Sequence, residues 1–197
     1  MIKRIFFDVG GVLGASALEF SYFNLSSNGK NISKDRLRNL FYDRRLTTCP
    51  DGALKNLLSN EFKDLGLMQE DVLNTFEQLP IYKENLDIVK QVKKKGIATG
   101  IISDQFAESA LILERRIPNF LELFNPVLFS SHIGCTKSSK EIFYSAMGLV
   151  EYSFENELLM VDDNKQNLDI ARSLGWSVLL YKHPQSLKEE LLKLGVL

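Results

Sequence analysis

Short apolar segments rich in β-branched and aromatic residues recur along the chain, and turn residues bound each of them. They read IKRIFF near the N-terminus, IATGII after Gly96, and then PVLFS (126–130), ELLMV (157–161) and SVLLY (177–181). Helical patterns lie between the later segments, over residues 85–95 and 164–174, and each ends at a glycine. Apolar strands that alternate with amphipathic helices are typical of a parallel sheet covered on both faces. We therefore predict an α/β fold with a parallel sheet at its core.

A helical segment interrupts this alternation directly after the first predicted strand. Four helices are predicted here, over residues 17–25, 33–44 with Ser33 as the N-cap, 51–65 and 69–78, and the polar stretch SSNGKN separates the first two. Consecutive amphipathic helices with short connections favour a small bundle. We therefore predict two domains: a core formed by residues 1–14 and 82–197, and an all-α helical cap formed by residues 15–81.

The composition argues against several classes of partner. The chain of 197 residues carries 24 Lys and Arg against 25 Asp and Glu. Because these charges nearly balance, the overall charge does not favour binding to nucleic acid or to an anionic membrane. No stretch approaches the ~20 apolar residues of a membrane span. Cys49 and Cys135 lie far apart, a spacing that supports neither a zinc site nor a disulfide framework. We expect a reduced, cytoplasmic chain that binds a small molecule, and neither nucleic acid nor a membrane.

One carboxylate, Asp8, stands within the otherwise apolar and small-residue stretch RIFFDVGGVLGASA. Its charge argues against a secretory signal, because an aspartate within an apolar membrane segment costs about 2.5–3.5 kcal/mol. The alternative is a short buried strand, residues 2–7, that presents Asp8 at its carboxyl end before a tight turn at Gly10 and Gly11. Ligands of open α/β sheets bind at such strand ends. Asp8 is therefore the first candidate site residue.

Polar residues of definite types follow the later predicted strands. GIISD presents Ser103, VDDNKQN presents Asp162 and Asp163, and GCTKSSKEIF places Lys137 at the start of the helix after the third apolar segment. Because the ends of parallel strands share one edge of a sheet, these side chains should converge on Asp8. Carboxylates gathered in this way need a hard cation, and oxygen ligands suit Mg²⁺. Lys137 and Ser103 then supply a positive charge and a donor for an anion such as a phosphoryl group.

Each of these residues has a simpler interpretation when it is taken alone. Ser103 can cap the next helix, Lys137 can lie on the surface, and two aspartates before a helix are often an N-cap that complements the helix dipole. The order of all these residues and their placement at successive strand ends are much more specific.

Together these segments resemble the motifs of the haloacid dehalogenase superfamily, whose members are mostly Mg²⁺-dependent phosphatases. FFDVGGVL resembles the first motif of that family, IISD the second, KSSKEIF the third and MVDDNKQN the fourth. The helical segment after the first motif is similar to the family's four-helix cap, and the resemblance covers nearly the whole chain. It implies a Rossmann-like core and a phosphatase-like hydrolase that acts on a small phosphate ester.

The resemblance also implies a role for each matched residue. Asp8 would be the nucleophile that forms an aspartyl-phosphate, a covalent route that divides one difficult displacement into two easier ones. Ser103 would hold a phosphoryl oxygen, and Lys137 would neutralise both the nucleophile and the phosphate. Asp104 and Asn167 complete the candidate phosphate-binding residues.

The Mg²⁺ implied by the resemblance would be bound by the Asp8 side chain, the Gly10 carbonyl and Asp163, with Asp162 also a ligand or close by. Most phosphatases of the family carry a second aspartate two residues after the nucleophile, where it acts as general acid and base. Gly10 occupies that position here. General acid–base catalysis contributes about 10²–10⁴-fold. We therefore expect a weak phosphatase, or one that favours a good leaving group.

Asp104 is a second departure, because the family usually has asparagine at this position. An added negative charge beside a phosphate site should weaken anion binding unless it is paired or points away. In the cap, Tyr42, Arg44 and Arg45 are candidates for substrate contact, although a solvated helix end is the simpler interpretation of the two arginines.

Three other functions stay open from the sequence. A dehalogenase of the family also lacks the second aspartate, because a departing halide needs no proton, but it works without the metal that Asp162 and Asp163 indicate. A non-catalytic member would bind a partner or a phosphorylated ligand, yet it has no physical need for mutually repelling carboxylates. A phosphoacceptor receiver domain would carry its acidic pair after the first strand, whereas here the pair comes late.

Overall fold

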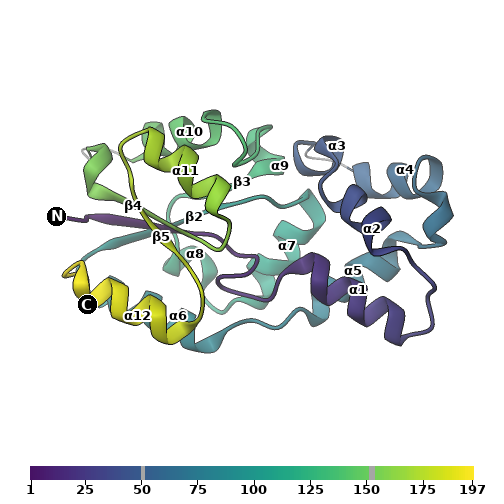
Figure 1. Cartoon of the computed structure of the whole chain (residues 1–197), viewed down its shortest axis with the longest axis horizontal. Helices are drawn as coiled ribbons and strands as arrows, with labels where there is room; N and C mark the ends of the chain where they lie inside the picture. The colour runs from purple at the N-terminus through teal and green to yellow at the C-terminus, as the bar shows by residue number, and fades with distance from the viewer. Residues whose placement is uncertain (50–51, 151–153) are drawn as a thin grey trace.

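Five strands form one parallel sheet in the computed structural model, which describes residues 1–49, 52–150 and 154–197 (Figure 1). The strands are β1 (Arg4–Phe7), β2 (Ala98–Ser103), β3 (Val127–Phe129), β4 (Leu158–Asp162) and β5 (Ser177–Leu180). Their order across the sheet is β3-β2-β1-β4-β5, and every neighbouring pair is parallel. The predicted α/β class is confirmed, and β1 lies at the centre of the sheet.

Helices cover both faces of the sheet because the strands are apolar on both sides. One face carries α6 (Lys83–Lys94), α7 (Ala107–Arg116), α8 (Phe120–Leu123) and α12 (Pro184–Lys193), and the other carries α10 (Glu141–Leu149) and α11 (Lys165–Ser173). Along β1, Ile5 and Phe7 pack on the face covered by α6, α7, α8 and α12, whereas Phe6 packs on the face covered by α10 and α11. This alternation follows from the two-residue period of a strand. Two short elements, α9 (Ser130–Ile133) and the 3₁₀ turn η2 (Glu155–Glu157), complete this part of the chain.

The helices of residues 15–81 gather at one end of the sheet, on the right of Figure 1. They are α1 (Ala17–Ser27), α2 (Lys34–Phe41), α3 (Arg44–Thr47), α4 (Ala53–Asn60), the 3₁₀ turn η1 (Lys63–Leu65) and α5 (Gln69–Gln78). Their apolar residues form a cluster of their own. Two residues of the core join that cluster: Phe106, the N-cap of α7, and Ile112 within α7. Helix α7 therefore connects the sheet to the helical insert. The division into two domains at residues 15–81 stays a prediction.

Two of the predicted helices are shorter than expected. The helix predicted over residues 33–44 does start at its N-cap Ser33, whose side chain accepts from the Arg36 N–H, but it ends at Phe41. Asp43 then caps α3 by accepting from the Arg45 N–H, because a short acidic side chain competes with the helix for backbone donors. The helix predicted over residues 51–65 is divided into α4 and η1, and its predicted start at Asp51 lies outside the described residues.

The two connections between the insert and the sheet run side by side. The Ala15 N–H donates to the Pro80 carbonyl at 2.9 Å, and the Tyr82 N–H donates to the Leu13 carbonyl at 2.8 Å. A Cβ at Gly14 would lie 3.0 Å from the Pro80 carbonyl oxygen, so a larger residue there would push the two connections slightly apart.

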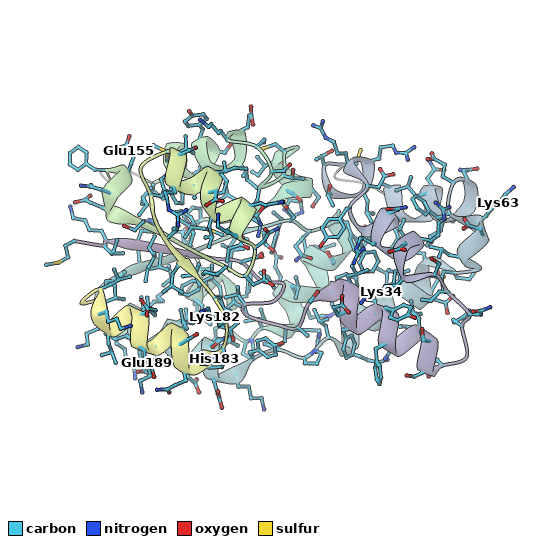
Figure 2. The ribbon with its side chains drawn as sticks, in the orientation of Figure 1. Lys34, Lys63, Glu155, Lys182, His183 and Glu189 are labelled. Carbon is cyan, nitrogen blue, oxygen red and sulfur yellow. The ribbon has the colours of Figure 1, made fainter. Side chains whose placement is uncertain are left out.

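The outer surface carries charged side chains, such as Lys63 on the insert and Glu189 on α12 (Figure 2). None of the helices within the described ranges combines the length and the apolar character that crossing a membrane requires.

Gly100 of β2 provides a test of the core packing. A Cβ at this position would lie 2.7 Å from the Phe6 ring and 2.8 Å from the Pro126 carbonyl oxygen. Because the strand backbone cannot easily move away, we predict that Gly100→Ala lowers the free energy of unfolding by about 1–3 kcal/mol in urea denaturation. The matched control is Gly148→Ala on α10, where a Cβ meets no atom within 4 Å. It should leave stability unchanged or raise it by up to about 1 kcal/mol. Equal stability of the two variants would contradict this packing.

Candidate active site

Asp8 lies directly after β1, at the carboxyl end of the central strand. Its backbone N–H donates to the Val161 carbonyl at 2.9 Å, which continues the pairing of β1 with β4. Its carboxylate is almost buried, and Oδ1 accepts from the Val9 N–H at 2.8 Å and from the Ser103 hydroxyl at 2.7 Å. The end of β2 therefore supplies a hydroxyl to the carboxylate at the end of β1.

Lys137 lies between two buried carboxylates. Its Nζ is 2.6 Å from Asp8 Oδ2 and 2.7 Å from Asp162 Oδ2, and only 2% of the lysine side chain is exposed. The predicted position of Lys137 at the start of a helix is wrong, because α10 begins only at Glu141 and Lys137 lies in the turn that precedes it. Asp104 holds this turn, since its Oδ1 accepts from the Lys137 backbone N–H at 2.9 Å.

Burial and neighbouring charges shift the pKa values of Asp8 and Lys137. Burial raises the pKa of Asp8 to about 7; the positive charge of Lys137 opposes this rise, and the negative charge of Asp162 adds to it. For Lys137, burial lowers the pKa, but the charges of Asp8, Asp162 and Asp104 outweigh it and raise the pKa above its usual value. The ammonium therefore keeps its charge, which compensates the carboxylates around it.

The two aspartates at the end of β4 have different surroundings. Asp162 is fully buried: its Oδ1 accepts from the Asn164 N–H at 2.7 Å, and its Oδ2 accepts from Asn167 Nδ2 at 3.1 Å. Asp163 is exposed, and its pKa is raised by partial burial and by the neighbouring charge of Asp162. One carboxylate oxygen from each of Asp8, Asp162 and Asp163 lies within 4.8 Å of the others, a grouping that could hold a metal ion. The predicted convergence of these side chains is thus present in the structure.

Two glycines follow Asp8 and differ in their surroundings. Gly11 has a positive φ of 79°, and a Cβ there would lie 2.1 Å from Asp163 Oδ2. Gly11 is therefore needed both for its left-handed backbone and for the close approach of Asp163. A Cβ at Gly10 would meet no atom within 4 Å, so a larger residue fits there. From the local pattern Gly11 is predicted only as part of a turn, because a contact with a residue 152 positions away leaves no local pattern.

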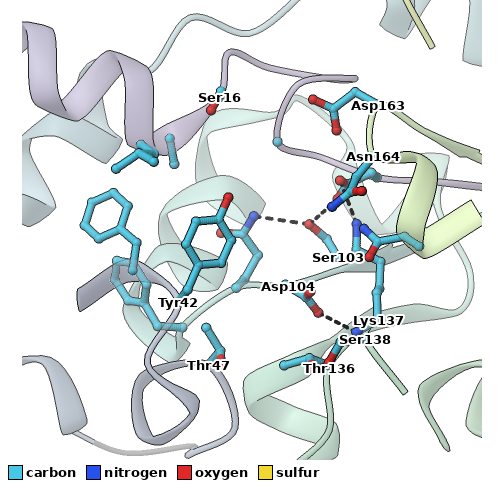
Figure 3. A pocket seen from close by; sticks show the side chains of 18 of the residues that line it. Ser16, Tyr42, Thr47, Ser103, Asp104, Thr136, Lys137, Ser138, Asp163 and Asn164 are labelled. Atoms are coloured by element: carbon cyan, nitrogen blue, oxygen red, sulfur yellow. Dashed lines mark hydrogen bonds and ion pairs between the residues drawn. The ribbon is translucent and has the colours of Figure 1, made fainter. Parts of the chain in front are cut away.

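A cavity of about 450 Å³ lies between this edge of the sheet and the helical insert (Figure 3). Its walls include Asp8, Gly10, Ser103, Asp104, Lys137, Asp163 and Asn167 on the sheet side, and Leu18, Phe41, Tyr42, Arg44, Thr47 and Phe76 on the insert side. Arg45 is not among them, because its guanidinium pairs with Asp43 and Glu61. Of the three candidate contacts in the insert, Tyr42 and Arg44 therefore remain.

Several solved structures share this fold. A predicted HAD-like family hydrolase from Porphyromonas gingivalis is 22% identical, with a TM-score of 0.80 over 98% of each chain. A HAD family enzyme from Bacteroides thetaiotaomicron, in complex with magnesium and inorganic phosphate, is 18% identical, with a TM-score of 0.73 over 92% of this chain and 95% of that one. L-2-haloacid dehalogenase from Xanthobacter autotrophicus, with chloropropionic acid covalently bound, is 15% identical, with a TM-score of 0.67 over 100% of this chain and 85% of that one.

These likenesses show that the chain has the fold of the haloacid dehalogenase-like hydrolases. No protein-family model and no curated protein sequence matches the chain.

The contact between Gly11 and Asp163 predicts an effect on metal binding. We expect Gly11→Ala to weaken Mg²⁺ binding by tenfold or more, because the added Cβ displaces the exposed carboxylate of the acidic group. Isothermal titration calorimetry with Mg²⁺ measures the change. Gly10→Ala is the matched control: it keeps the backbone carbonyl, its side chain fits, and it should bind Mg²⁺ like the wild type. Wild-type affinity in Gly11→Ala would contradict a role of the Gly11–Asp163 contact in metal binding.

Proposed function

We propose that this chain is a metal-dependent, phosphatase-like hydrolase of the haloacid dehalogenase superfamily that acts on a small organophosphate through an aspartyl-phosphate at Asp8. The observation that carries the proposal is the ion-paired group at the cavity: Asp8 and Asp162 share the Lys137 ammonium, and Asp163 faces the same space. A carboxylate held beside a fixed cation is suited to attack an anionic phosphoryl group, since the cation offsets the repulsion between the two.

The residues present fit a magnesium ion. Mg²⁺ prefers oxygen ligands, and the carboxylates of Asp8, Asp162 and Asp163 offer oxygens within 4.8 Å of one another. Asp8, Asp163 and the Gly10 carbonyl would hold the ion, with Asp162 a further ligand or beside it. When bound, Mg²⁺ would neutralise part of the negative charge of the carboxylates and the phosphoryl group.

The chain's own residues account for the two chemical steps. A carboxylate oxygen of Asp8 attacks phosphorus, the bond between phosphorus and the ester oxygen breaks, and the leaving group takes up a proton. Water then attacks the phosphorus of the aspartyl-phosphate, which releases phosphate and restores the Asp8 carboxylate. Ser103 and Lys137, which contact the two oxygens of Asp8 at 2.7 Å and 2.6 Å, orient the nucleophile and face the phosphoryl group.

The proton of the first step has no donor at position 10. Gly10 has no side chain, although the space beside it is open. A missing general acid costs about 10²–10⁴-fold in rate for a poor leaving group, and little for a leaving group that departs as a stable anion. The proposal therefore favours esters with a good leaving group, or a reaction in which substrate or water carries the proton.

Halide displacement is the second reaction to be considered, because a haloacid dehalogenase shares the fold. The three gathered carboxylates favour phosphoryl transfer, since a reaction that needs no metal has no use for a second and a third negative charge beside the nucleophile. A protein that only binds a phosphorylated ligand is the remaining alternative, and turnover distinguishes it.

Hydrolysis of 4-nitrophenyl phosphate tests the proposal, because nitrophenolate is a good leaving group. We predict phosphate release with Mg²⁺ and none with EDTA. Asp8→Asn should lower the rate by 10³-fold or more, by loss of the nucleophile, whereas Asp87→Asn, at an exposed position on α6, should leave it unchanged. Gly10→Asp should raise the rate, and raise it most for alkyl phosphates that leave poorly. Equal rates in Asp8→Asn and the wild type would refute the mechanism. Mg²⁺ binding without release from the wild type or Gly10→Asp would indicate a binding protein.

A further inference from the structure

Gln105 connects the candidate active site to the start of α7. The residue follows β2 by two positions and is only 7% exposed. Its Nε2 donates to the Ser103 hydroxyl oxygen at 3.2 Å, and its Oε1 accepts from the Ser109 hydroxyl at 2.8 Å. Ser103 in turn donates to Asp8 Oδ1 at 2.7 Å. A buried chain of hydrogen bonds therefore runs from Ser109 to the carboxylate of Asp8.

The orientation of the Gln105 amide follows from this chain. A serine hydroxyl has one hydrogen, and Ser103 donates it to Asp8 Oδ1. The Ser103 hydrogen therefore points to Asp8, and the Ser103 oxygen must accept from its other neighbour. Only the amide nitrogen of Gln105 can donate there, which decides between the two possible orientations of the amide group. The Ser109 hydroxyl, on the opposite side, meets the carbonyl oxygen.

The amide nitrogen of Gln105 carries a second hydrogen. Within the described part of the chain this N–H has no hydrogen-bond acceptor, although Gln105 lines the cavity together with Asp8, Ser103 and Lys137. A buried donor without a partner costs free energy, which an incoming anionic oxygen can recover. Asp104, which lies between Ser103 and Gln105, cannot serve in this way when ionised, because a carboxylate has no hydrogen to donate.

We propose that Gln105 is a phosphoryl-binding residue, whose side-chain amide holds Ser103 with one N–H and donates the other to a phosphoryl oxygen of the substrate. This assignment rests on the proposed function in that the ligand is a phosphate ester. It adds a neutral donor to the positive charge of Lys137 and the hydroxyl of Ser103, and it explains how a site that also contains Asp104 attracts an anion.

Binding of inorganic phosphate tests the assignment without requiring turnover. We expect Gln105→Met, which keeps the length of the side chain and removes the amide, to weaken phosphate binding about tenfold in calorimetry with Mg²⁺ present. Gln105→Glu should weaken it further, since it replaces the donor with a negative charge. The control is Gln166→Met, an exposed residue of α11 at the rim of the same cavity, which should change the affinity by less than twofold. Thermal unfolding of each variant reports whether the fold is kept.

The two proposals fail in different ways. If 4-nitrophenyl phosphate is hydrolysed, Gln105→Met should raise KM by about the same factor as the phosphate dissociation constant, with kcat changed much less, because the contact exists before and during the reaction. Wild-type phosphate affinity and KM in folded Gln105→Met and Gln105→Glu would overturn the role of Gln105 and leave the phosphatase intact. Phosphate binding that depends on Gln105 in a protein that hydrolyses no ester would support this role and overturn the phosphatase.

Discussion

The ammonium group of Lys137 is the interaction on which the rest of the site depends. It forms ion pairs with Asp8, directly after β1, and with Asp162 at the end of β4, and all three side chains are buried. Buried carboxylates on neighbouring strands repel each other, and leaving a buried charge without its partner costs about 3–5 kcal/mol. Asp104 holds the turn that contains Lys137, and Asn167 holds the Asp162 carboxylate. A purely structural core would be served as well by apolar residues, so we attribute this arrangement to chemistry at the cavity.

The parallel sheet explains why these residues can meet at all. β1 lies between β2 and β4, so the side chains that follow these three strands point to one edge, and the helical insert that leaves after β1 encloses the space above that edge. Gly11 lets the chain turn away from β1 while the Asp163 carboxylate packs against it. Fold and site are therefore consequences of the same strand order.

Much of this could be predicted from local patterns. Each of the five apolar segments overlaps a strand, and the helix over residues 69–78 has the predicted bounds. Residues at parallel strand ends, such as Asp8 and Ser103, converge by topology alone. Features that depend on individual side-chain contacts do not follow from such patterns. The helix break at Asp43 depends on a side-chain cap, and the partner of Gly11 and the orientation of Gln105 exist only in the folded chain. Lys137 is predicted at the start of a helix, whereas it lies in a turn before α10 that Asp104 holds.

The most direct test of the central claim, that Asp8 forms a covalent bond to phosphorus, is a crystal structure with Mg²⁺ and beryllium trifluoride, which mimics a phosphoryl group on a carboxylate. The account predicts beryllium bonded to an Asp8 carboxylate oxygen, with its fluorine atoms in contact with Ser103 and Lys137. A beryllium fluoride bound elsewhere, with Asp8 still paired only to Lys137 and Ser103, would contradict it.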